Sequence, residues 1–92
     1  MTKKRDKLEI VNDILKTIRD KGNNVKPTHI LYKSNLSHQM MTSYLDELIE
    51  KGFVKEVKDK KNRKRYSLTE TGFSYINDYH KIKSFVDSYG LE

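Results

Sequence analysis

The fold is decided by residues 37–72, which read SHQMMTSYLDELIEKGFVKEVKDKKNRKRYSLTETG. Near the start of this stretch, Met41, Leu45 and Leu48 recur at steps of four and three residues. That spacing puts all three side chains on one buried helix face. We therefore predict a helix over residues 38–51, with polar residues on the opposite side of its first turns.

The pattern changes after Gly52, where apolar residues begin to alternate with charged ones. A period of two is typical of a half-exposed strand, so we predict a strand over 53–58. Residues 59–63 are polar and turn-like, and 64–68 resume the alternation. The sequence therefore predicts a β-hairpin directly after the helix. Thr69 then suits the N-cap of a final helix that runs to about residue 89.

Two more helices are predicted upstream. Residues 4–21 carry a stripe at helical spacing, formed by Leu8, Val11, Ile14, Leu15 and Ile18. A short helix follows Pro27 over residues 28–34, with Ile30 and Leu31 as its buried face, and residues 25–26 fit a very short strand.

The resulting order is helix, short helix, helix, hairpin, helix. Two helices joined by a tight turn form a helix-turn-helix, and the hairpin after them is the wing. The predicted fold class is α+β, mainly α: a winged helix-turn-helix with an extended C-terminal dimerisation helix. We divide the chain into a head, residues 1–72, and a dimerisation helix, residues 73–92.

Three segments carry a resemblance to a known family. They are 28–37 (THILYKSNLS), 48–54 (LIEKGFV) and 66–72 (YSLTETG). They resemble the helix-turn segment, the entry to the wing and its return strand in small archaeal winged-helix proteins. The resemblance covers about residues 8–89 and implies DNA binding by a dimer joined through a C-terminal antiparallel coiled coil.

Composition narrows the function classes. The formal net charge is +6, from 19 basic and 13 acidic residues, which favours a polyanionic partner. There is no cysteine, no glycine-rich phosphate loop and no ligand-like clustering of His29, His38 and His80. We therefore expect no enzymatic activity, metal, cofactor or small-molecule ligand. We also expect no membrane contact, and a cytoplasmic, nucleoid-associated location.

The predicted wing holds most of the positive charge. Only Glu56 and Asp59 oppose its seven basic residues, which are Lys55, Lys58, Lys60, Lys61, Arg63, Lys64 and Arg65. A hairpin would gather these cations on a narrow projection where DNA phosphates can meet them. The alternative is a solvated loop that keeps a sheet edge from aggregating.

The start of the third helix offers a set of small polar residues. They are Ser37, His38, Gln39, Thr42 and Ser43. In a helix-turn-helix these positions enter the major groove, where Gln pairs with adenine and Ser or Thr contacts bases or phosphate. The set lacks an arginine for bidentate guanine contact, which predicts modest sequence specificity. The alternative is a helix face that is simply solvated.

The final helix carries a heptad seam. Its residues are Tyr75, Tyr79, Ile82, Val86 and Tyr89, with Phe85 beside them. We expect Phe73 and Ile76 to complete the core of the head, and the seam to pair with a second copy. The alternative is that the helix folds back on the first helix of its own chain.

Three functions remain open from the sequence. The first is a dimeric transcription regulator that binds double-stranded DNA, and the second is an architectural DNA-binding protein with weak specificity. The third is a winged helix used as a protein–protein interaction module, whose basic wing meets an acidic partner.

Overall fold

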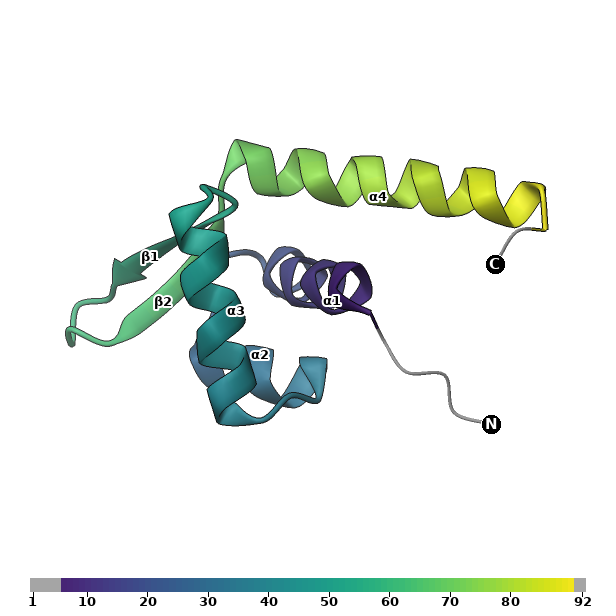
Figure 1. Ribbon diagram of the computed structural model, residues 1–92. Helices are drawn as coiled ribbons and strands as arrows, with labels where there is room; N and C mark the ends of the chain where they lie inside the picture. Colours follow the sequence, from purple (N-terminus) through teal and green to yellow (C-terminus); the bar gives the residue numbers. More distant parts are fainter. Residues whose placement is uncertain (1–5, 91–92) are drawn as a thin grey trace.

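The computed structural model describes residues 6–90, in which one long helix projects from a head formed by the other helices and a β-hairpin (Figure 1). Three helices precede a β-hairpin. They are α1 (Lys7–Asp20), α2 (Pro27–Ser34) and α3 (His38–Glu50). The hairpin consists of β1 (Val54–Lys58) and β2 (Lys64–Leu68), and α4 (Glu70–Ser88) follows it. The element order and the winged-helix fold class predicted from the sequence are therefore confirmed.

Local capping explains where the helices begin. Asp6 accepts a hydrogen bond from the backbone N–H of Glu9, Ser37 from that of Met40, and Thr69 from that of Gly72. The helix predicted to begin at residue 4 therefore begins after the Asp6 cap, and residue 4 itself lies outside the described residues. The turn between α2 and α3 passes through Asn35, whose φ of 53° is left-handed.

The hairpin is antiparallel and in the register Val54↔Leu68 to Lys58↔Lys64. Val25 adds a single bridge to Tyr66, with backbone hydrogen bonds of 2.8 and 2.9 Å in the two directions. The very short strand predicted at residues 25–26 is thus reduced to one residue, which ties the start of α2 to the base of the wing.

One core joins the three helices of the head, the base of the wing and the first turns of α4. Its most enclosed side chains are Ile14, Leu15, Ile18, Ile30, Leu45 and Val54. Met41 and Leu48 are buried as predicted, and so is Ile76 of α4. The head is therefore held together by burial of one continuous apolar surface.

Two residues predicted to be buried are exposed instead. Leu8, in the first turn of α1, is 58% exposed, and Phe73, in the first turn of α4, is 42% exposed. In contrast, α4 joins the head closely at Gly72. A Cβ atom there would lie 2.3 Å from the carbonyl oxygen of Phe53, so only glycine permits this approach.

Candidate nucleic-acid interface

The first two turns of α3 present a polar surface to solvent. Ser37, His38, Gln39, Thr42 and Ser43 are all exposed, while Met41, Leu45 and Leu48 fix the opposite face in the core. The hydroxyl of Thr42 donates to the carbonyl oxygen of His38 at 3.0 Å, and Ser37 caps the helix. The structure therefore brings all five predicted residues together on one accessible end of the helix.

The second half of α3 is acidic, and one of its carboxylates is drawn back toward α1. Glu47 lies 2.8 Å from the ammonium of Lys7. The hydrogen bond between them raises the pKa of Lys7 and lowers the pKa of Glu47. Both charges are solvent-exposed, so the pair adds little to stability. Its effect is on charge distribution, since it offsets the negative charge of one carboxylate on α3.

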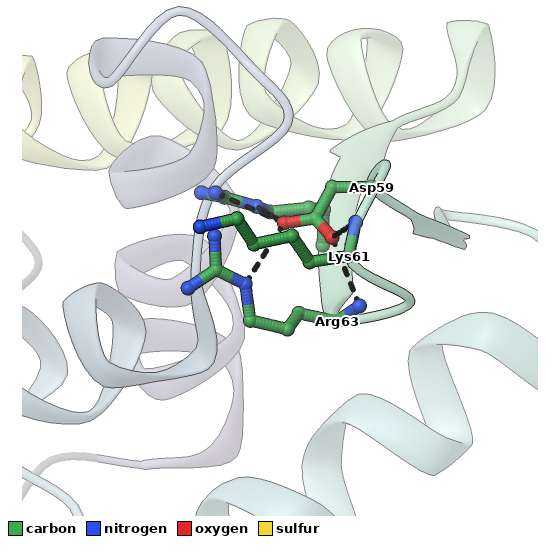
Figure 2. Close-up of polar contacts among 4 residues, drawn as sticks. Asp59, Lys61 and Arg63 are labelled. Atoms are coloured by element: carbon green, nitrogen blue, oxygen red, sulfur yellow. Dashed lines mark hydrogen bonds and ion pairs between the residues drawn. The ribbon is translucent and has the colours of Figure 1, made fainter.

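A single carboxylate organises the tip of the wing. Figure 2 shows Asp59 at the centre of four contacts. Its side chain accepts from the backbone N–H groups of Lys61 and Arg63, each at 2.9 Å. It also accepts from Nε of Arg63 at 3.2 Å and Nε of Arg65 at 3.3 Å. These donors, the Arg63 backbone N–H first, hold the pKa of Asp59 below its usual value.

Sequence reasoning treated Asp59 only as a charge opposing the basic residues and missed this role. The available signal was its position at the start of a polar turn, where Asp side chains accept from backbone N–H groups further along the chain. The turn also needs Asn62 at a φ of 62°, a left-handed conformation that Asn tolerates well. Together these two residues fix the shape of the tip.

The pairings divide the basic residues of the wing into two groups. Arg63 and Arg65 are held by Asp59, and the Lys64 ammonium lies 3.7 Å from a Glu56 carboxylate oxygen. Four exposed lysines form no ion pair with another residue of the described chain, and these are Lys55, Lys58, Lys60 and Lys61. The unpaired cations of the wing are therefore these four lysines and not its arginines or Lys64.

A small cleft continues this basic surface onto α2. It has a volume of about 310 Å³ and lies between the start of α2, with Lys26 and Thr28, and the β2 side of the wing. Lys26 was not among the residues predicted from the sequence. Nothing in its own segment marks it, because only the bridge between Val25 and Tyr66 brings it beside the wing.

The Asp59 network predicts an ordered wing tip that one substitution loosens. In Asp59→Ala, amide exchange at Lys61 and Arg63 should accelerate severalfold in NMR spectra, because both backbone groups lose their acceptor. Asp20→Ala is the matched control, since it removes an exposed acid that pairs with Arg19 on α1. Unchanged protection at both amides would contradict the role given to Asp59.

The same network has a defined pH dependence. Because the pKa of Asp59 is lowered in the folded chain, the ionised side chain stabilises the wing tip fully at pH values above the ordinary Asp pKa of about 3.9. This stabilisation is lost as the pH falls through the lowered pKa that Asp59 has in the folded chain.

The seam on α4 divides into two parts. Near the head, Tyr75 and Tyr79 are half-buried and stacked with ring centroids 6.4 Å apart, and Tyr75 packs edge-on against Phe53 at 5.5 Å. Further along, Ile82, Phe85 and Tyr89 are 64–66% exposed. Val86 is half-buried. The first part of the seam is thus packed against the head, while most of the second part is exposed, on the portion of α4 that projects from the head (Figure 1).

An apolar groove runs along this seam, with a volume of about 500 Å³. Leu8 and Phe53 form its wall on the head, and Tyr75, Tyr79, Ile82 and Val86 form its wall on α4. The hydroxyl of Tyr75 is buried beside it with no hydrogen-bond partner among residues 6–90. Burial raises the pKa of that hydroxyl.

Two other properties concern residues 6–90 as a whole. They contain no group of three His, Cys, Asp or Glu side chains placed to hold a metal ion. Every helix in this range is too short or too polar to span a lipid bilayer.

Comparison with known proteins agrees with this arrangement. Residues 4–86 match the family described as winged helix-turn-helix. An uncharacterized protein of the archaeon Methanocaldococcus jannaschii is 32% identical over 85 residues, which are 92% of this chain and 80% of that protein.

Solved structures show the same fold. Sso10a-2, a DNA-binding protein from Sulfolobus solfataricus, is similar with a TM-score of 0.75 and 26% identity, over 94% of this chain and 90% of that chain. MepR, a transcription regulator of the Staphylococcus aureus multidrug efflux pump MepA, is similar with a TM-score of 0.78 and 14% identity, over 89% of this chain and 62% of that chain. The resemblance to archaeal winged helices is confirmed. Because the family match spans most of the chain and the fold recurs in these structures, the chain belongs to the winged helix-turn-helix family.

Proposed function

We propose that the chain binds double-stranded DNA as a homodimer and has no enzymatic activity. The observation that carries the proposal is that one chain combines the exposed polar start of α3 with a wing that has four exposed, unpaired lysines. The similarity to Sso10a-2, a DNA-binding protein, supports it. A nucleoid-associated location in the cytoplasm follows from this proposal.

The two surfaces have different tasks in this proposal. The first turns of α3 enter the major groove, where Gln39 and Thr42 contact base edges and Ser37, His38 and Ser43 contact bases or phosphate. The basic wing residues, together with Lys26, contact the phosphate backbone. Phosphate contacts supply affinity for any duplex, and the few polar side chains of α3 supply modest specificity.

The homodimer follows from the uncovered part of α4. Ile82, Phe85 and Tyr89 expose most of their surface, while the groove beside Tyr75 and Tyr79 is open. An antiparallel pair of α4 helices would place each exposed end against the groove of the other copy. In this arrangement residues 1–72 serve as the DNA-binding head and 73–92 as the dimerisation segment.

Affinity selection from a random duplex pool at near-physiological salt tests this function. Enrichment of one motif supports a transcription regulator. Steep salt dependence without a motif supports an architectural protein. No DNA binding even at low salt contradicts the proposal and leaves the alternative of a protein–protein interaction module, for which the basic wing would suit an acidic partner.

The contacts proposed for α3 predict a change in sequence preference. Gln39→Ala or Thr42→Ala should alter the selected sequences more than overall affinity, because base contacts specify and phosphate contacts position. Loss of a good bidentate contact should cost about 1–3 kcal/mol at the preferred base. Selection with each variant measures this. If both variants select the same sequences with equal discrimination, α3 does not read bases.

A further inference from the structure

A second cleft between α1 and α4 has no role in DNA binding or dimerisation as described above. Its volume of about 350 Å³ lies within the range of small-molecule sites, about 300–1,000 Å³. Asn12, Lys16 and Arg19 line it from α1 and share one helix face because they are spaced by four and three residues. Asn77 and His80 line it from α4.

The side chains of this cleft are suited to a negatively charged ligand. Lys16 and Arg19 carry positive charge, and the imidazole of His80 offers an N–H donor. No acidic residue lines the cleft. Next to Arg19 in the sequence, Asp20 accepts a hydrogen bond from Nε of Arg19 at 3.0 Å. The terminal guanidinium nitrogens form no ion pair within the described chain, so they are available to a ligand.

Asn12 gives independent evidence for a ligand. Its side chain lines the cleft, the residue is only 9% exposed, and Oδ1 is buried with no hydrogen-bond partner among residues 6–90. A buried acceptor without a partner lowers stability, so an apolar residue of similar size would suit an empty cleft better. The asparagine is explained when its side chain turns toward the cleft and a ligand donates a hydrogen bond to Oδ1.

We propose that this cleft binds a small, multiply charged organic anion that also carries a hydroxyl group, such as a hydroxytricarboxylate or a phosphorylated polyol. The anionic groups pair with Lys16, Arg19 and His80, and the hydroxyl donates to Oδ1 of Asn12. The sequence alone predicted no small-molecule ligand, because these residues lie on helices far apart in the chain. A ligand that bridges α1 and α4 would hold the long helix against the head.

Calorimetric titration and NMR amide shifts of the full chain test the proposal. Citrate and propane-1,2,3-tricarboxylate differ only in the hydroxyl, and glycerol 2-phosphate represents the phosphorylated polyols. At constant ionic strength, we expect saturable binding of citrate or glycerol 2-phosphate, with shifts centred on residues 12–19 and 76–80. Propane-1,2,3-tricarboxylate should bind roughly tenfold more weakly than citrate, because it leaves Asn12 without a donor.

Substitutions separate this site from general attraction to a basic protein. Arg19→Ala should lower the affinity of the cleft for the anion by roughly tenfold. Lys33→Ala removes the same charge from an exposed position on α2 and should leave the affinity unchanged. Asn12→Leu should abolish the preference for citrate over propane-1,2,3-tricarboxylate. It should also raise the melting temperature of the ligand-free chain by roughly 5 °C, because it removes a buried unsatisfied acceptor.

Several results would overturn the proposal. They are no saturable binding of either citrate or glycerol 2-phosphate, shifts confined to α3 and the wing, and a lower melting temperature in Asn12→Leu. Equal loss of affinity in Arg19→Ala and Lys33→Ala would overturn it as well. None of these measurements uses DNA, so their failure leaves the proposed DNA binding untouched.

Discussion

Ile82→Asp should convert the chain into a monomer that binds DNA roughly 100-fold more weakly than the parent dimer. Ile82 is 65% exposed and lies midway along the seam. A charge at this point would have to be desolvated in the dimer, which costs far more than leaving it in water. Loss of the dimer removes the gain in apparent affinity that linked heads provide, typically 10²–10⁴-fold.

Sedimentation equilibrium at micromolar concentration decides this prediction. Ser84→Asp is the matched control, because it adds the same charge at an exposed position on the far side of α4 from the seam. This control should remain a dimer with little change in DNA affinity. A parent chain that sediments as a monomer would refute both the dimer and the avidity argument that depends on it.

The second large effect concerns the free lysines of the wing. Lys58→Ala, Lys60→Ala and Lys61→Ala together should lower affinity for every duplex by about 100-fold at physiological salt. Each lost phosphate contact should flatten the plot of log K against log salt by about 0.9, or about 2.7 for one wing. The arginines are less suitable targets, because Asp59 already holds Arg63 and Arg65.

The control for the wing removes the same charge elsewhere. Lys21→Ala, Lys51→Ala and Lys81→Ala together replace exposed lysines at the ends of α1 and α3 and on α4. Their salt slope should stay close to that of the parent. Equal slopes in the wing variant and the parent would show that the wing lysines do not contact phosphate.

The sequence predicted most of the fold because its signals were local. The steps from Met41 to Leu48 and the change of period after Gly52 each identify one element without reference to distant residues. The same spacing rule failed for Leu8, since periodicity gives the direction of a side chain but not how completely its neighbours cover it. Phe73 failed for a related reason, because hydrophobicity alone does not say how much of a side chain near the buried face of α4 is covered.

The candidate site also has a part that the sequence predicts and a part that only the structure shows. The exposed set on α3 and the basic hairpin could be predicted from the sequence, but the division of the wing cations could not. The division of these cations depends on Asp59, which lies six residues before Arg65 in the sequence. The two side chains meet only because the hairpin turn brings them together. The seam shows the same limit, since its heptad spacing does not reveal that Tyr75 and Tyr79 pack against the head while most of the later part is exposed.

The close fit at Gly72 gives the length of α4 a consequence for the spacing of the two heads in a dimer. Since no side chain fits between Gly72 and the Phe53 carbonyl oxygen, the start of α4 is packed directly against the backbone of the head. In an antiparallel pair, the number of residues after Gly72 would then set the separation of the two heads. Inserting seven residues would keep the seam on the same side and lengthen the helix by about 10 Å. Related chains could thus fit differently spaced binding sites by changing helix length in steps of seven, without altering the head.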